Sequence, residues 1–118
     1  MIKIAQGAEA VLFRDRGEVI KERLSKNYRL PQIDEALRKF RTRREAKVLS
    51  KLEEMDFPAP HLKDFSDKRM SIIMDFIPGE KLRDVLAHGD DYQKLAKEIG
   101  ERVGKLHLKN IVHGDLTT

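Results

Sequence analysis

The 118-residue sequence predicts an α+β fold, in which a five-stranded antiparallel sheet and one long helix precede a helical carboxy-terminal part. Three observations support this prediction. Short apolar stretches separated by turn residues occur before Pro31 and again between residues 62 and 76, as expected of strands. From Pro31 onward, apolar residues recur at helical spacing. The helical spacing returns after Pro78-Gly79, which predicts a boundary between residues 1–77 and residues 78–118.

The first three strands are predicted from short apolar stretches that alternate with glycine-containing turns. Gly7 and Gly17 lie in the two gaps, and short strands joined by such turns are typical of an antiparallel meander. The strands are expected at Ile2–Ala5, Ala10–Phe13 and Val19–Leu24.

A single long helix is predicted from Pro31 to about Met55. Proline suits the first turn of a helix, and Asp34 and Glu35 place negative charge at the positive end of the helix dipole. The prolines of residues 56–60 end the helix, because each removes a donor and favours extended backbone before it. The apolar residues at helical spacing are Ile33, Leu37, Phe40, Val48, Leu49, Leu52 and Met55.

Two further strands and two helices complete the predicted order. The strands are expected at Leu62–Phe65 and Ser71–Phe76, and the second is nearly continuously apolar, which predicts burial on both of its faces. The helices are expected at Lys81–Ala87 and Tyr92–Leu108. The longer helix has an apolar stripe that consists of Leu95, Ala96, Ile99, Val103 and Leu106.

The composition excludes several classes of protein. Cysteine is absent, so there is no disulfide framework, thiolate metal site or cysteine nucleophile, which favours a reducing compartment. No apolar run approaches the roughly 18 residues that span a bilayer, and residues 1–4 do not begin a signal peptide. We therefore expect a soluble, cytoplasmic protein with no membrane contact. The scarcity of Asn and Gln beside many charged residues is expected of a heat-adapted protein.

Positive charge is concentrated in residues 20–51. This segment has eleven Lys and Arg against four Asp and Glu, a net charge of +7, so the rest of the chain carries −3 of the total +4. Such charge suits RNA, nucleotide phosphates or an acidic protein, although charged helix faces are more often simply solvated. The cations of the long helix that an RNA-binding module could use are Arg38, Lys39, Arg41, Arg43, Arg44 and Lys47. They run round the helix, and few aromatic residues are available for stacking, so direct sequence readout of RNA is not expected.

Ordered motifs over the whole chain resemble the amino-terminal lobe of a protein kinase joined to the start of its carboxy-terminal lobe. The motifs are Gln6-Gly7-Ala8-Glu9-Ala10, Val19-Ile20-Lys21, Lys26-Asn27-Tyr28-Arg29 with Pro31 and Asp34, Arg44-Glu45-Ala46, and His113-Gly114-Asp115-Leu116-Thr117-Thr118. The set is most similar to the small atypical protein kinases of the KEOPS complex, which are relatives of the RIO kinases. The resemblance implies that residues 1–77 are the amino-terminal lobe. Residues 78–118 would then be the hinge and a truncated helical carboxy-terminal lobe that ends in the catalytic loop.

The resemblance also implies an ATP-binding site. Phosphoryl transfer requires that the nucleotide phosphates and their metal are held in position and their charge offset. Lys21 is the candidate for binding the α and β phosphates, and Glu45 for orienting Lys21 through an ion pair. Gly7 would let the backbone of its turn approach the phosphates. The carbonyl group of Asp75 and the N–H group of Ile77 are expected to bind adenine.

Asp115 is the candidate catalytic carboxylate, which would accept or orient the proton of an attacking hydroxyl or water. Gly114 precedes it where most protein kinases have arginine, so control by activation-loop phosphorylation is not expected. His113 is expected to fix the loop by hydrogen bonds. The other histidines, which have no mutual spacing that suggests a metal site, are His61, His88 and His107.

Magnesium ligands are not expected within these 118 residues. In the kinase pattern the metal-binding asparagine would be at position 120, and a metal-binding aspartate would follow it. We therefore expect ATP and Mg to be used by a longer parent protein, and this truncated chain to be inactive alone. The apolar stripe of residues 80–118 would lack its usual cover. That segment is thus expected to pack on another chain, to fold back on the amino-terminal lobe, or to be poorly ordered.

The function implied by the resemblance is that of a serine/threonine protein kinase or ATPase of the KEOPS complex, which supports threonylcarbamoyladenosine modification of tRNA. The implied partners are the threonylcarbamoyltransferase subunit and the small subunit that docks on the kinase amino-terminal lobe, with tRNA met through the complex. Two alternatives stay open, a non-catalytic docking module for a KEOPS partner subunit and a phosphate-contacting RNA-binding module. Binding that weakens steeply with salt would favour RNA, and salt-insensitive binding would favour protein docking.

Overall fold

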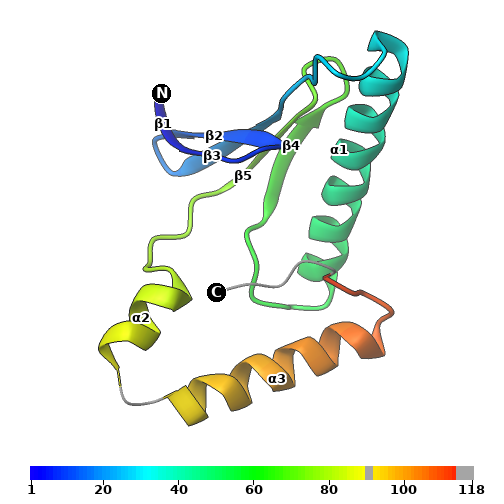
Figure 1. Cartoon of the computed structure of the whole chain (residues 1–118). Helices are drawn as coiled ribbons and strands as arrows, with labels where there is room; N and C mark the ends of the chain where they lie inside the picture. The colour runs from blue at the N-terminus through cyan, green and yellow to red at the C-terminus, as the bar shows by residue number, and fades with distance from the viewer. Residues whose placement is uncertain (90–91, 114–118) are drawn as a thin grey trace. The chain divides into compact units, whose positions relative to one another are not determined.

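A computed structural model describes residues 1–89 and 92–113 of the chain. The chain divides into a first compact unit, Met1–Ile77, and a second unit that begins at Pro78. The elements are β1 (Ile2–Gln6), β2 (Ala10–Asp15), β3 (Glu18–Arg23), α1 (Pro31–Glu54), β4 (Leu62–Ser66), β5 (Ser71–Asp75), α2 (Leu82–His88) and α3 (Tyr92–Leu108) (Figure 1). Each begins and ends within two residues of its predicted position. The assignment of the two units as kinase lobes stays a prediction.

The five strands form one antiparallel sheet in the order β1-β2-β3-β5-β4, which confirms the predicted fold class. The first three strands pair consecutively, whereas β5 crosses over to pair with β3 and leaves β4 at the edge. This order places Lys21 in the middle strand, opposite Leu12 of β2 and Ile72 of β5. Pairing on both sides fixes the backbone from which the Lys21 side chain extends.

Helix α1 lies along the sheet and contacts β4 and β5 (Figure 1). Pro31 occupies its first turn, where the missing N–H group has no intrahelical partner to lose. The other end is closed before the prolines are reached. Asp56 has a φ of 55°, and Phe57 N–H donates to the carbonyl group of Leu52 at 2.9 Å. This is the Schellman arrangement, which satisfies the last carbonyl groups of a helix.

The core of the first unit is small and includes polar side chains. Its buried apolar residues are Val11, Val19, Ala46, Leu49, Met70 and Ile72, and its buried polar residues are Asp34, Thr42 and Ser71. The prediction that β5 is buried on both faces is wrong for its second half, because Ile73 and Met74 are only half-buried. The first unit, which the structure describes throughout, has one helix, and that helix covers one face of the sheet. Ile73 points away from the face of the buried Ile72 and keeps contact with solvent.

The second unit contains α2 and α3. The structure describes every residue of α3 and buries none of them. The stripe residues that are half-buried are Leu95, Ile99, Val103 and Leu106. The three alternatives that the sequence analysis gives for residues 80–118 stay predictions. In the described part of the chain, no helix is both long and apolar enough to cross a membrane.

Candidate nucleotide-binding site

An ion pair between Lys21 and Glu45 is at the centre of the candidate site. Lys21 Nζ lies 2.9 Å from Glu45 Oε1, so the pair joins the middle strand β3 to α1. The two side chains are 27% and 24% exposed. An ammonium group has three N–H donors, so Lys21 can bind an anion while it stays bonded to Glu45. The structure therefore brings together the lysine and the glutamate that the sequence singled out.

A second cation, which the sequence analysis did not single out, binds the same carboxylate. Arg23 Nη2 lies 2.8 Å from Glu45 Oε2, so each oxygen of Glu45 has its own cation. Arg23 follows Lys21 by two positions in β3, and residues at that spacing face the same side of a strand. This alternation places Arg23 on the same face as Lys21, but it does not identify Glu45 as the partner of Arg23.

The turn between β1 and β2 is hydrogen-bonded to the residue after β3 and forms an ion pair with α1. Gly7 N–H donates to the carbonyl group of Ala10 at 3.0 Å, and Leu24 N–H donates to the carbonyl group of Glu9 at 2.9 Å. The Glu9 carboxylate lies 3.2 Å from Arg41 Nη1 of α1. A Cβ atom at Gly7 would have no other heavy atom within 4 Å, so the space beside this residue is open. That geometry suits the approach of a phosphate to the turn backbone.

Asp34, in the first turn of α1, is a buried carboxylate surrounded by donors. It is 4% exposed and accepts hydrogen bonds from Lys26 N–H at 3.0 Å, Arg29 Nη1 at 3.4 Å and Arg38 Nε at 2.8 Å. Burial alone would raise its pKa, but the hydrogen bonds from Lys26 and Arg38 outweigh burial and lower the pKa of Asp34. Arg38 also donates to the carbonyl group of Arg23 at 3.3 Å. The segment before α1 is thereby attached to the end of β3.

The two residues predicted to bind adenine lie at the end of β5. Strand pairing ends with Glu18 opposite Asp75, and the Phe76 N–H group is bonded to the β2–β3 turn. The backbone is thus fixed by hydrogen bonds as far as Phe76. The next residue, Ile77, has an exposed side chain. The Asp75 side chain lies 3.3 Å from Lys63 Nζ of β4. The prediction for adenine concerns the backbone carbonyl group of Asp75, which this side-chain contact does not involve.

The candidate catalytic residue Asp115 lies outside the described residues, as does Gly114, and its role stays a prediction. No group of three or more His, Asp or Glu side chains within the described ranges could hold a metal ion. Magnesium that is bound with a nucleotide needs only one or two carboxylates, because phosphates and waters complete its octahedron. The magnesium expected with ATP therefore stays a prediction.

Half of the cations proposed for RNA binding are already paired within the chain. The pairs are Arg38 with Asp34, Arg41 with Glu9 and Arg43 with Asp67. Two hydrogen bonds of 2.9 and 2.8 Å join Arg43 to Asp67, and they lower the pKa of Asp67 and raise that of Arg43. Arg44 and Lys47 are exposed. The RNA-binding hypothesis has less support than the sequence suggested, because RNA phosphates would compete with these carboxylates.

Comparisons with known proteins agree with this geometry. The RIO domain family matches residues 2–118. The KEOPS complex subunit Bud32 of Pyrococcus abyssi is 39% identical over 127 residues, which cover 98% of this chain and 58% of that protein. A probable bifunctional tRNA threonylcarbamoyladenosine biosynthesis protein of Methanocaldococcus jannaschii is 41% identical over 98% of this chain and 22% of its own length. The EKC/KEOPS complex subunit BUD32 of Encephalitozoon cuniculi is 39% identical over 96% of this chain and 56% of its own length.

The chain spans less than two thirds of the length of each of these relatives. The matches to these relatives cover 96–98% of this chain. The antiparallel sheet with its long helix agrees with the kinase-like amino-terminal lobe of a RIO domain. The ordered motifs, the fold and the match over residues 2–118 lead to one conclusion: the chain belongs to the RIO domain family.

Proposed function

We propose that this chain provides the nucleotide-binding lobe of an ATP-dependent kinase-like protein, either a serine/threonine protein kinase or an ATPase. The observation that supports the proposal most is the 2.9 Å contact between Lys21 and Glu45, which joins β3 to α1. In protein kinases a strand lysine that is paired with a helix glutamate binds the ATP phosphates. An ordinary surface lysine is solvated, whereas Lys21 is partly buried and held by a partner on another element.

Each predicted site residue has one task in this proposal. Lys21 binds the α and β phosphates, Glu45 keeps Lys21 directed at them, and the open space at Gly7 lets the turn cover them. The Asp75 carbonyl group accepts a hydrogen bond from adenine, and the Ile77 N–H group donates one.

Asp115 is proposed as the catalytic carboxylate. It would accept or orient the proton of the attacking hydroxyl or water, while the terminal phosphoryl group moves to that oxygen and ADP leaves. Magnesium supplies charge neutralisation of the phosphates when it is bound with ATP. This chain's own contribution, in the part described, is to position and neutralise the phosphates through Lys21.

We propose further that the chain serves threonylcarbamoyladenosine biosynthesis on tRNA within a KEOPS complex in the cytoplasm. The support is the naming of its relatives, two of which are KEOPS Bud32 subunits and one of which is a tRNA threonylcarbamoyladenosine biosynthesis protein. The proposed partners are the threonylcarbamoyltransferase subunit and the small subunit that docks on the lobe formed by the sheet and α1. Contact with tRNA would be made through the assembled complex.

Isothermal titration calorimetry with ATP tests the nucleotide site. We expect the 118-residue chain to bind ATP, and Lys21→Ala to weaken binding at least about tenfold, because it removes a charge-assisted bond to the phosphates. Lys47→Ala is the matched control, since Lys47 is an exposed lysine of α1 outside the site. Equal weakening by both substitutions would show an effect of overall charge only. Absence of ATP binding by the unsubstituted chain would contradict the proposal.

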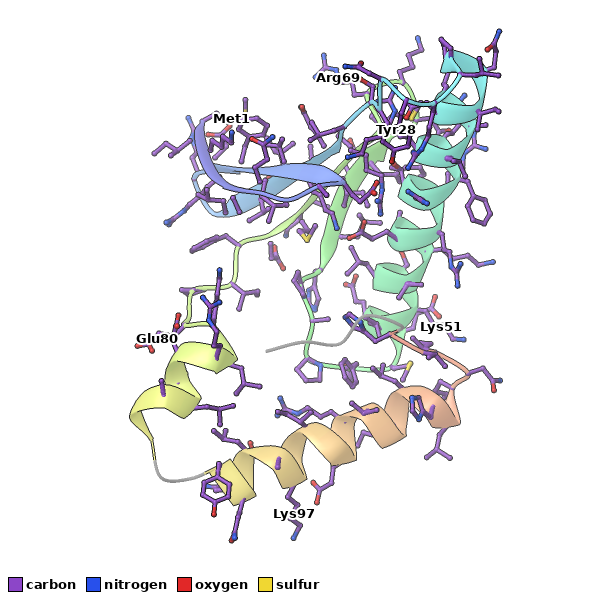
Figure 2. The ribbon with its side chains drawn as sticks, viewed as in Figure 1. Met1, Tyr28, Lys51, Arg69, Glu80 and Lys97 are labelled. Carbon is purple, nitrogen blue, oxygen red and sulfur yellow. The ribbon has the colours of Figure 1, made fainter. Side chains whose placement is uncertain are left out.

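A docking module for a protein partner is the second candidate function. The large apolar side chains that are more than half exposed around the start of α1 are Tyr28, Leu30, Ile33 and Phe40. Ile33 and Phe40 are seven residues apart and therefore lie on the same face of the helix. Figure 2 shows Tyr28 near the amino-terminal end of α1. Exposed apolar side chains on one helix face favour a protein contact when they form a continuous patch. A chain that binds a KEOPS subunit but no ATP would fit this function instead.

A further inference from the structure

We propose that Arg23 is a positioning residue of the nucleotide site, which holds the Glu45 carboxylate so that Lys21 stays directed at the phosphates. The inference rests on the proposed function. It starts from the two oxygens of Glu45, since Oε1 is bonded to Lys21 at 2.9 Å and Oε2 to Arg23 at 2.8 Å. A carboxylate that is bonded at both oxygens has a fixed orientation. The geometry of the pair is therefore set before a nucleotide binds.

Arg23 is more deeply buried than Lys21. Its side chain is 15% exposed, compared with 27% for Lys21. Its N–H group donates to the carbonyl group of Met70 at 3.0 Å, its carbonyl group accepts from Arg38 at 3.3 Å, and it is paired with Ala10 of β2. A guanidinium group is planar and always charged, whereas a lysine is a point charge on a flexible stem. Arg23 thus suits a fixed contact, and Lys21 suits a contact that must adjust to a ligand.

Arg23 also changes the charge of the cluster. Lys21 and Glu45 together are neutral, and Arg23 gives the three side chains a net charge of +1. A net positive charge in a partly buried site attracts an anionic phosphate. When Lys21 binds a phosphate while it stays bonded to Glu45, its charge is shared between two anions. Arg23 then supplies a second cation to Glu45, so the negative charge of this partly buried carboxylate stays compensated.

One atom of Arg23 has no hydrogen-bond partner. Arg23 Nε is the single buried side-chain nitrogen or oxygen without a partner among the described residues. A buried donor left unbonded destabilises a fold. The fold keeps an arginine here although its Nε is unbonded, and departures of this kind are expected at functional positions.

Calorimetry with ATP on three variants tests this role. Arg23→Met removes the charge at similar length, and we expect it to weaken ATP binding about tenfold. Arg23→Lys keeps the charge, and we expect it to recover at least half of that loss on a logarithmic scale. Arg43→Met is the matched control, because Arg43 also binds a carboxylate of another element, Asp67, but lies outside the site. It should bind ATP like the unsubstituted chain. Circular dichroism at the titration temperature checks that each variant is folded, and Arg23→Gln replaces Arg23→Met if the latter is not.

Each outcome separates this inference from the proposed function. ATP binding that is lost in Lys21→Ala but unchanged in Arg23→Met would overturn the role of Arg23 and leave the nucleotide site in place. Equal weakening of ATP binding in Arg23→Met and in the control Arg43→Met would also overturn it, because the loss would then reflect the overall charge of the chain. If the unsubstituted chain binds no ATP, the proposed function fails and this inference fails with it.

Discussion

Asp34 illustrates how much one carboxylate can determine at the residue scale. Its sequence position predicts a favourable interaction with the helix dipole and a place in the motif that precedes the helix. In the structure it is buried and bonded to the Lys26 N–H group and to the side chains of Arg29 and Arg38. A buried charge is tolerated only when donors surround it, and these donors come from the segment before α1 and from α1 itself. Asp34 therefore fixes the path of the chain between β3 and α1.

Asp34→Asn should change the acid dependence of stability. The folded-state pKa of Asp34 is lowered from the ordinary value of 3.8, so its ion pairs contribute stability above that value and lose it as pH falls through the folded-state pKa. We expect the variant to be less stable than the unsubstituted chain at pH 7 and to lose less stability below about pH 4. Chemical denaturation at pH 7, 4 and 3 measures both effects. The control is Asp84→Asn, which changes an exposed carboxylate of α2 and should keep the acid dependence of the unsubstituted chain. Identical pH profiles for Asp34→Asn and the unsubstituted chain would contradict the prediction.

The sequence predicts the main pair of the site but not its surroundings. Lys21 and Glu45 can be identified because each lies in a short motif whose place in the kinase pattern is fixed. Arg23 and Glu9 belong to contacts between residues far apart in the chain, and such contacts depend on how α1 is rotated against the sheet. Periodicity does not determine that rotation closely enough to choose partners among so many charged side chains.

At the scale of elements, the end of α1 has a different cause from the one that the sequence suggests. The prolines after residue 57 would stop any helix, yet the helix has already closed at Asp56, whose φ is 55°. The left-handed region is unfavourable for residues with a Cβ atom and neutral for glycine. The strands were predicted well because alternation and turns are local properties. The partial exposure of Ile73 and Met74 in β5 was not, because burial depends on what packs on each part of the sheet.

Asp56→Gly should stabilise the first unit. Glycine adopts the left-handed conformation without strain, so we expect the free energy of unfolding to rise by about 0.5–1 kcal/mol. Urea denaturation followed by circular dichroism measures the change. In Asp56→Ala the residue keeps a Cβ atom at the same positive φ, so the free energy of unfolding should not rise. Stabilisation by alanine as large as that by glycine would show that the backbone strain is not the cause.

At the scale of the whole molecule, the two units differ in how firmly their helices are buried. In α1 the buried residues are Asp34, Thr42, Ala46 and Leu49, whereas α3 has none. Local opening is easiest where few side chains are buried and backbone hydrogen bonds face solvent. Among the described residues, the helix α3 therefore lacks the buried side chains that protect α1.

Hydrogen exchange followed by mass spectrometry should separate the two helices. We expect amides of Tyr92–Leu108 to exchange at least about tenfold faster than those in the middle of α1. The helix α1 serves as the internal control, since both helices are measured in the same sample. Equally slow exchange in the two would show that the apolar stripe of α3 is covered by protein, and the prediction would be wrong.

The attachments of the turn between β1 and β2 determine how a ligand can enter beneath it. Glu9 joins this turn to Leu24 through its carbonyl group and to Arg41 through its carboxylate. Arg41 precedes Glu45 by four residues, one turn along the same side of α1. The Arg41 and Glu9 side chains are 39% and 49% exposed, so this ion pair couples the turn to α1 only weakly. The backbone bond to Leu24 is the firmer attachment, so opening of the turn would have to break its link to the end of β3.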